Sequence, residues 1–185
     1  YGAAIGDDAL YSVAGDGTRA ILDLLREAGD DVKATFFTTG RFAERFPKLV
    51  KEMAAAGHEV ASHGYSHSSF AEDDLAKSKR ILEDVAGAPV VGFRMARLAP
   101  VDKRRILDAG YRYESSMNPI WLPGRYNNLS KPILPFREEC GLWQFPISVV
   151  PGVRFPLFWL SFKNLPLPLY RGLARFVLRR TGLFN

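Results

Sequence analysis

The sequence has one cysteine, three histidines and no long apolar run. With Cys140 alone, an internal disulfide framework is excluded, and we expect a buried or half-buried side chain there. No apolar stretch approaches the roughly 20 residues that cross a bilayer, and no charged-then-apolar leader opens the chain, so we expect a soluble chain without a transmembrane segment. Both ends nevertheless look cut, because Tyr1 leads at once into an apolar stretch and residues 183–185 stop where another strand is expected to begin.

The charged residues form no block of one sign. The formal net charge of +5 comes from Lys and Arg that are spread along the chain and become denser after Arg171. This pattern argues against a nucleic-acid partner and permits attraction to anionic glycan or membrane surfaces. The 185 residues, 47% of them apolar, suffice for one globular domain with a sizeable core. We therefore expect a single domain over residues 1–185, truncated at both ends, with its oligomeric state left open.

Short apolar or β-branched stretches alternate with amphipathic ones along the sequence. The expected strands are 2–5, 32–38, 58–62, 90–93 and 111–113, with a further strand pattern at 143–150. The expected helices are 20–28, a helix that begins near Pro47 and ends at Gly57, 73–85, 104–109 and 167–180. This alternation is typical of a parallel α/β sheet or barrel.

Polar side chains follow three of the expected strands. Asp7 and Asp8 follow the first strand, His63 and His67 follow the third, and Arg94 follows the fourth. In parallel α/β folds the loops after the strands share one face of the sheet. We therefore expect these five side chains to line one cleft.

The scarce histidines suggest a metal site. His63 and His67 lie four residues apart, and with one carboxylate they would form a three-ligand site that leaves a position for water, as hydrolytic zinc sites require. Taken alone, the pair is equally well explained as two polar loop histidines. His58 precedes its strand, away from the carboxyl end, and is interpreted as structural.

Three Asp-Asp pairs differ in where the expected elements place them. The pair at 30–31 precedes a strand, and a surface turn explains it. The pair at 73–74 lies in the first turn of a helix, where the helix dipole favours negative charge. The pair at 7–8 ends a strand, where two adjacent carboxylates repel each other unless a cation or an arginine holds the charge. Arg94 could supply that charge, whereas Arg97, a competitor for the role, is equally well explained as a surface arginine.

Two stretches make the sequence similar to a known family. They are 33–37, which reads Lys-Ala-Thr-Phe-Phe, and 56–67, which reads Ala-Gly-His-Glu-Val-Ala-Ser-His-Gly-Tyr-Ser-His. With the motifs above, the sequence resembles the polysaccharide deacetylases of the NodB-homology type, carbohydrate esterase family 4, over nearly its whole length. The resemblance implies an α/β fold, a distorted and incomplete (β/α) barrel. It also implies a hydrolase that removes N-acetyl groups from a glycan, which we expect at the bacterial cell envelope or on the cytoplasmic side of that envelope.

The resemblance assigns a role to each residue of the expected cleft. It implies that Asp7 is the catalytic base, that Asp8, His63 and His67 bind the metal, and that Arg94 orients the base. The implied cofactor is Zn²⁺ or another divalent ion such as Co²⁺. A groove for the glycan should offer aromatic faces to sugar rings, and the candidates are Tyr65, Trp121, Tyr126 and Trp143. For Trp159, within an apolar run, we expect burial in the core or a lid.

Three positions depart from the family pattern. The first motif reads Ile-Gly-Asp-Asp-Ala over 5–9, where the family usually has an aromatic residue before the pair and glycine after it. Ala96 stands where the third motif normally has proline. The general-acid histidine of the family lies on a late strand, and no such residue precedes Asn185. We interpret the chain as a truncated enzyme rather than a pseudoenzyme and expect a histidine in the strand that would follow.

Three other functions remain open at this stage. A carbohydrate-binding homologue with impaired catalysis fits the absent acid, and it would bind glycan without releasing acetate. Another metal-dependent amidohydrolase would release ammonia from small amides. The basic, aromatic end of the chain could instead be a membrane-surface element, which liposome flotation would detect. The substrate could be peptidoglycan, a chitin-like oligomer, a capsule or a lipid-linked sugar.

Overall fold

The structure, a computed structural model, describes residues 7–71 and 73–185, with the backbone alone for residues 7–11. The chain divides into two compact units between Gly92 and Phe93. Each unit is an assembly of short strands and helices around its own buried side chains. No helix of the described residues is both long and apolar enough to cross a membrane.

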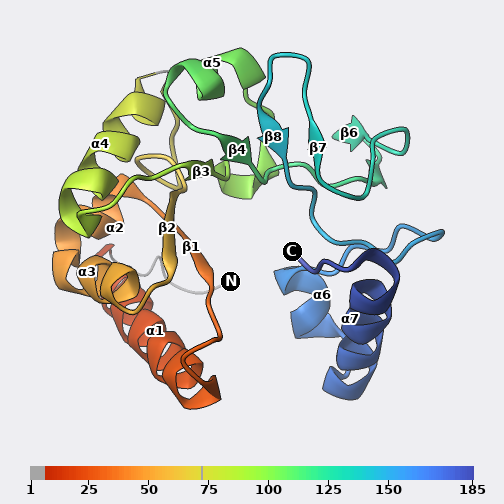
Figure 1. Ribbon diagram of the computed structural model, residues 1–185, viewed down its shortest axis with the longest axis horizontal. Helices are drawn as coiled ribbons and strands as arrows, with labels where there is room; N and C mark the ends of the chain where they lie inside the picture. The colour runs from red at the N-terminus through yellow and green to blue at the C-terminus, as the bar shows by residue number, and fades with distance from the viewer. Residues whose placement is uncertain (1–6, 72) are drawn as a thin grey trace. The chain divides into compact units, whose positions relative to one another are not determined.

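The first unit contains a parallel strand pair covered by helices. Its elements are α1 (Asp7–Ala28), β1 (Thr35–Thr38), α2 (Gly40–Arg45), α3 (Pro47–Ala55), β2 (Glu59–Ser62) and α4 (Asp74–Ala86). Strands β1 and β2 run parallel, with Thr35 opposite Glu59 and Thr38 opposite Ser62. Helices α3 and α4 pack against β2, and α2 packs against α4 (Figure 1).

The apolar spacing of α3 explains how this unit closes. Leu49, Val50 and Met53 recur on one face of the helix and are all buried. Pro47 occupies the first turn, where its missing N–H has no partner to lose. Helix α4 ends at Gly87, whose φ of 67° is the left-handed conformation that terminates helices. These boundaries agree with the sequence prediction.

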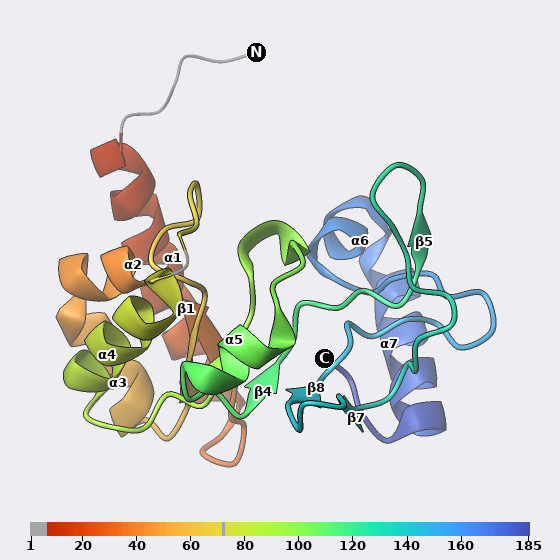
Figure 2. The same cartoon turned by 90° about the horizontal axis from the view of Figure 1, so that it is seen from above.

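The second unit contains a mixed sheet, a separate hairpin and two terminal helices. Its elements are β3 (Gly92–Phe93), the 3₁₀ turn η1 (Ala96–Leu98), α5 (Lys103–Asp108), β4 (Tyr113–Glu114), β5 (Trp121–Leu122), β6 (Tyr126–Asn127), β7 (Phe136–Arg137), β8 (Trp143–Gln144), α6 (Trp159–Asn164) and α7 (Leu167–Thr181). The strand order is β3-β4-β8-β7, with β4 and β8 parallel and β7 antiparallel to β8. Strands β5 and β6 form their own antiparallel pair. Figure 2 shows α6 and α7 side by side.

Fully buried aromatic and aliphatic side chains form the core of the second unit. The rings of Phe93 and Tyr111 lie 5.3 Å apart, and Ile106 and Leu142 are completely enclosed. The side-chain amide of Asn185 donates hydrogen bonds to Ser115 and to the carbonyls of residues 145 and 146, which fixes the last described residue to this core.

The α/β class with parallel strand pairs agrees with the sequence prediction, and no closed barrel forms among the described residues. Several boundaries differ. The strands expected at 32–38, 90–93 and 143–150 shorten to β1, β3 and β8, and the helix expected at 20–28 is the second half of α1. Helix α2 was not predicted. The expected strand at 2–5 lies outside the described residues.

The predicted burial of Trp159 in the core is wrong. Its side chain is 65% exposed on α6, and Lys163 Nζ lies 5.7 Å from its ring centroid. Leu157 occupies the buried position instead, with 1% of its side chain exposed. The apolar run is therefore divided between the buried Leu157, which precedes α6, and exposed side chains on α6 such as Trp159. Cys140 is half-buried, as expected.

Candidate active site

The two histidines of the motif lie on one loop of the first unit. This loop follows β2, and the ring centroids of His63 and His67 are 5.4 Å apart. His63 is half-buried and His67 is exposed. The structure therefore brings these two predicted residues together at the carboxyl end of a parallel strand.

Backbone hydrogen bonds fix this loop to the start of α2. His63 N–H donates to the Thr38 carbonyl at 2.9 Å, which continues the β1–β2 ladder. The amides of Gly40 and Arg41 donate to the carbonyls of Gly64 and Tyr65, each at 3.0 Å. The first N–H groups of a helix have no partner within the helix. Helix α2 thus uses them to position the histidine loop.

Side chains connect the same loop to α4. Ser62 Oγ accepts from the Gly64 amide at 3.2 Å and lies 2.9 Å from Ser78 Oγ. The Tyr65 hydroxyl donates to Glu44, and Lys77 Nζ lies 3.5 Å from the centroid of the tyrosine ring. An ammonium group therefore covers one face of Tyr65. Its predicted contact with a sugar ring stays a prediction.

A substitution at Gly40 tests how closely the loop is packed. A Cβ atom there would lie 2.8 Å from Tyr65 Cδ2. We expect Gly40→Ala to lower the free energy of unfolding by about 1–3 kcal/mol, the usual cost of overpacking, in urea titrations. Gly17→Ala is the matched control, because its Cβ meets no described atom within 4 Å in α1, and alanine there should stabilise by about 0.5–1 kcal/mol. Equal stability of the two variants would contradict the close packing.

The histidine pair fits a metal ion in part. Zn–N bonds are about 2.0–2.1 Å long, so rings with centroids 5.4 Å apart are close enough to share one ion. Among the described side chains, no group of three or more His, Cys, Asp or Glu could hold a metal. The side chains of Asp7 and Asp8 lie outside that description. The third ligand therefore stays a prediction.

The backbone of Asp7 and Asp8 opens helix α1. In a first helical turn the dipole favours carboxylates without a metal, as it does for Asp73 and Asp74 at the start of α4. The position that distinguished this pair in the sequence, the end of a strand, falls on residues outside the described part of the chain.

Arg94 lies in the second unit and is fixed by three hydrogen bonds. Its Nε donates to the Ser115 carbonyl at 2.8 Å, and Nη2 donates to Ser115 Oγ at 2.6 Å and to Asn185 Oδ1 at 3.0 Å. Burial lowers the pKa of Arg94 to about 10, so the side chain remains a cation at neutral pH. Arg97 is exposed, in agreement with a surface role. The predicted pairing of Arg94 with Asp7 stays a prediction.

The remaining aromatic candidates lie on strands of the second unit. Trp121 on β5 is 59% exposed and Trp143 on β8 is 45% exposed, so both rings are accessible. Tyr126 on β6 is half-buried and lies opposite Leu122. Their predicted contacts with sugar rings stay predictions.

His58 has the surroundings expected of a structural residue. Its side chain is 9% exposed, and its ring centroid lies 5.5 Å from that of Phe36. Burial is the main cause of its lowered pKa, and the positive charge of Lys33 lowers the pKa further. A buried neutral imidazole away from the histidine loop fits the structural interpretation.

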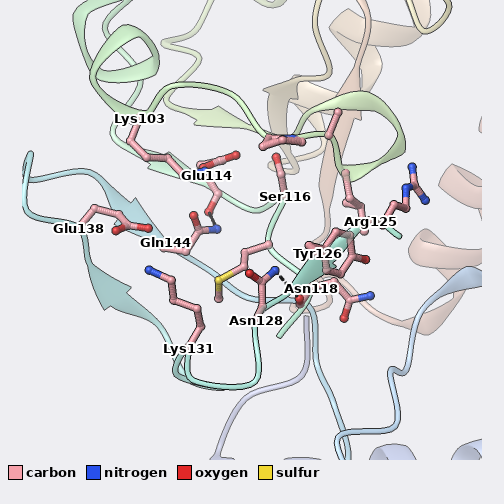
Figure 3. Close-up of a pocket in the computed structure, with 14 residues that line it drawn as sticks. Lys103, Glu114, Ser116, Asn118, Arg125, Tyr126, Asn128, Lys131, Glu138 and Gln144 are labelled. Carbon is pink, nitrogen blue, oxygen red and sulfur yellow. Dashed lines mark hydrogen bonds and ion pairs between the residues drawn. The ribbon is translucent and has the colours of Figure 1, made fainter. Parts of the chain in front are cut away.

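Sequence reasoning missed a pocket in the second unit. It has a volume of about 220 Å³, and its lining includes Glu114, Asn118, Tyr126 and Gln144 (Figure 3). Of these, only Tyr126 was singled out from the sequence. Glu114 and Gln144 belong to strands 30 residues apart that pair in parallel, and no motif marks either residue.

The sequence profile of the polysaccharide deacetylase family matches residues 7–113. That range is more than half of the chain and includes every predicted catalytic and metal-binding residue. The chain therefore belongs to the polysaccharide deacetylase family, as its motifs predicted.

Relatives of known name match part of the chain. A peptidoglycan-N-acetylglucosamine deacetylase of Bacillus cereus is 43% identical over 77 residues, which are 38% of this chain and 27% of that protein. A chitooligosaccharide deacetylase of a Bradyrhizobium strain is 34% identical over 82 residues, 42% of this chain and 36% of that protein. The matched segments thus span about a third of these relatives.

Solved structures confirm the fold over most of the chain. A polysaccharide deacetylase structure from Mycobacterium smegmatis aligns with a TM-score of 0.64 and 23% identity, covering 94% of this chain and 63% of that one. The structure of PuuE allantoinase aligns with a TM-score of 0.69 and 19% identity, covering 93% and 57%. At these identities the likeness establishes the fold alone, which confirms the predicted deacetylase-type α/β architecture.

Proposed function

We propose that this chain is the catalytic domain of a metal-dependent hydrolase that removes N-acetyl groups from a glycan. The ligands would be Asp8, His63 and His67, holding Zn²⁺ or another divalent ion such as Co²⁺. The observation that carries the proposal is the histidine pair, 5.4 Å apart on a loop fixed by α2. Membership of the deacetylase family supplies the reaction class.

The bound ion would supply a Lewis acid that polarises the acetyl carbonyl and acidifies water. Asp7 takes the proton of the attacking water as general base. Arg94, a cation at neutral pH, would orient that carboxylate, as the family pattern implies. The departing sugar amine needs a proton donor. The family pattern implies that a histidine gives this proton.

The glycan would lie against exposed aromatic faces. Trp121 and Trp143 offer accessible rings in the second unit, and Tyr126 contributes to a pocket. Aromatic faces bind the C–H surfaces of sugar rings. A catalytically impaired glycan-binding homologue would use the same rings, so stacking supports a glycan ligand and does not by itself establish turnover.

Acetate release provides the direct test. We expect the protein, stripped of metal and reloaded with Zn²⁺ or Co²⁺, to release acetate from acetylated chito-oligomers or peptidoglycan fragments, and a chelator to stop the release. Binding of oligomer without acetate would favour the impaired homologue. Ammonia released from small amides in place of acetate would assign the chain to a different amidohydrolase activity.

A further inference from the structure

The pocket of the second unit is lined by residues from several segments that meet around one space. The loop after β3, strand β4 with the loop that follows it, β6 with its loop, and β8 all contribute lining residues (Figure 3). Its volume of about 220 Å³ is below the roughly 300–1,000 Å³ of pockets for drug-sized ligands. The space therefore suits one small ring.

Three buried oxygen atoms in this lining lack a hydrogen-bond donor among the described residues. They are Oε1 of Glu114, Oδ1 of Asn118 and Oε1 of Gln144. These residues are 0%, 3% and 0% exposed. Buried polar atoms in folded proteins almost always have a partner, from the protein, water or a ligand. The pocket therefore presents three acceptors to whatever occupies it.

In Glu114 and Gln144 the other polar atom of the side chain is already engaged, which orients the free acceptor. Gln144 Nε2 donates to the Glu114 carbonyl at 3.2 Å. Lys103 Nζ forms an ion pair with Oε2 of Glu114, whereas Oε1 of the same carboxylate has no hydrogen-bond donor among the described residues. Glu114 and Gln144 are register partners in the parallel pair β4–β8, so their side chains extend on the same face of the sheet.

The occupant must donate hydrogen bonds and also contact apolar walls. Leu98, Pro100 and Met117 line the pocket together with the Tyr126 ring. A sugar ring combines hydroxyl donors around its rim with apolar C–H faces, and so matches both kinds of surface. An anion would face the three acceptor oxygens, which cannot donate hydrogen bonds to it.

A bare divalent cation fits less well than a sugar. The pocket lining has two carboxylates, Glu114 and Glu138, and Glu114 is already paired with the ammonium of Lys103. Because like charges repel, the ammonium of Lys103 disfavours a metal cation beside the same carboxylate. Leu98, in the pocket wall, has a φ of 53°, which is uncommon for a residue other than glycine. Such residues concentrate at ligand sites.

We infer that this pocket binds one sugar ring of the glycan, whose hydroxyl groups donate to Glu114, Asn118 and Gln144. The inference rests on the proposed function for the choice of a glycan and assigns a site for one of its rings. Loss of an acceptor weakens sugar binding. The acetyl group would react at the proposed metal site and not in this pocket.

Two nearly isosteric variants test the pocket: Asn118→Leu and Gln144→Met. Each removes a free acceptor, and each lost hydrogen bond should weaken the binding of N-acetylglucosamine or its oligomers about 2- to 10-fold in calorimetric titrations. For Asn118→Leu, we expect the melting temperature to stay level or rise, because an apolar side chain replaces an acceptor that had no donor. Gln144→Met also loses the bond to the Glu114 carbonyl, so its binding data are interpreted only if its thermal unfolding remains cooperative.

Asn164→Leu on α6 is the matched control, because Asn164 is exposed and lies outside the pocket. It should bind sugar as the unmodified protein does. Inorganic phosphate and Ca²⁺ serve as competing probes. Unchanged sugar affinity in both pocket variants would overturn the inference. A pocket-dependent affinity for phosphate or Ca²⁺ without one for sugar would overturn it as well.

Because sugar binding is measured without turnover, this test separates the pocket from the proposed function. Binding that depends on Asn118 in a protein that releases no acetate would sustain the pocket and contradict the deacetylase. Acetate release with a KM unaffected by Asn118→Leu, together with unchanged binding, would sustain the deacetylase and overturn the pocket.

Discussion

His63→Ala and His67→Ala are each expected to abolish stoichiometric metal binding. Both side chains come from the loop fixed by α2, and their ring centroids are 5.4 Å apart. Substitution of residues that merely support metal ligands already lowers affinity about 10- to 100-fold, so loss of a ligand should lower it by at least about 100-fold. Metal analysis of the purified protein after dialysis, and Zn²⁺ titration, would measure the change. Acetate release should fall with the bound metal.

The third histidine of the chain provides the control. His58 is buried beside Phe36 and away from the loop, so His58→Gln should retain one ion per folded molecule even if it lowers stability. Circular dichroism of each variant establishes that metal was lost from a folded protein. If His63→Ala bound Zn²⁺ as tightly as the His58 variant does, the metal assignment would fail. The conclusion would then return to two polar loop histidines.

The parts of the fold that the sequence predicted well are those in which local signals agree with burial. In α3, Pro47 sets the start and three apolar residues at helical spacing become the buried face. In α4, Gly87 adopts the left-handed conformation that ends the helix. The strand predicted at 58–62 differs from β2 only in its first residue, since its apolar run is short and sharply bounded. Where capping, spacing and burial coincide, the boundaries follow from the sequence.

Other elements depend on tertiary contacts that no local pattern records. The first half of α1 contains Gly15 and Gly17, which disfavour a helix, yet the helix continues through both. A Cβ at Gly15 would lie 3.1 Å from the Phe46 ring. Glycine therefore lets this ring pack close to the helix. Helix α2 is only six residues long, and its cap is the side chain of Thr39. It positions the histidine loop through hydrogen bonds to residues that follow β2, and such contacts leave no local sequence pattern.

The candidate site shows the same division. The histidine motif is local, because both residues lie on one loop, and the sequence placed both after the same expected strand. The pocket is not local, since Glu114 and Gln144 meet through the pairing of β4 and β8. Their free acceptors depend on which partners the other atoms take, such as Lys103 for Glu114. A buried ion pair with an unpaired oxygen has no signature in the amino-acid pattern.

Asp7→Asn and Asp8→Asn should differ from each other, although the two residues are adjacent. Asp8→Asn is expected to lose the metal, because an amide is a weaker ligand than a carboxylate and the histidine pair alone leaves the site incomplete. Asp7→Asn should keep the metal and lose about 100- to 10,000-fold in turnover, since an amide cannot accept the proton of the attacking water. Metal content and acetate release, measured on the same preparations, give the two readouts.

Asp31→Asn is the matched control, because the pair at 30–31 lies in an exposed turn of the first unit. It should change neither the metal content nor the turnover. If both carboxylates at 7–8 served only the dipole of α1, each substitution would cost about 0.3–1 kcal/mol of stability and leave metal binding intact. A base beside a ligand predicts that only the Asp8 variant loses the metal and that a metal-loaded Asp7 variant loses turnover. A pair of helix-capping carboxylates predicts neither result.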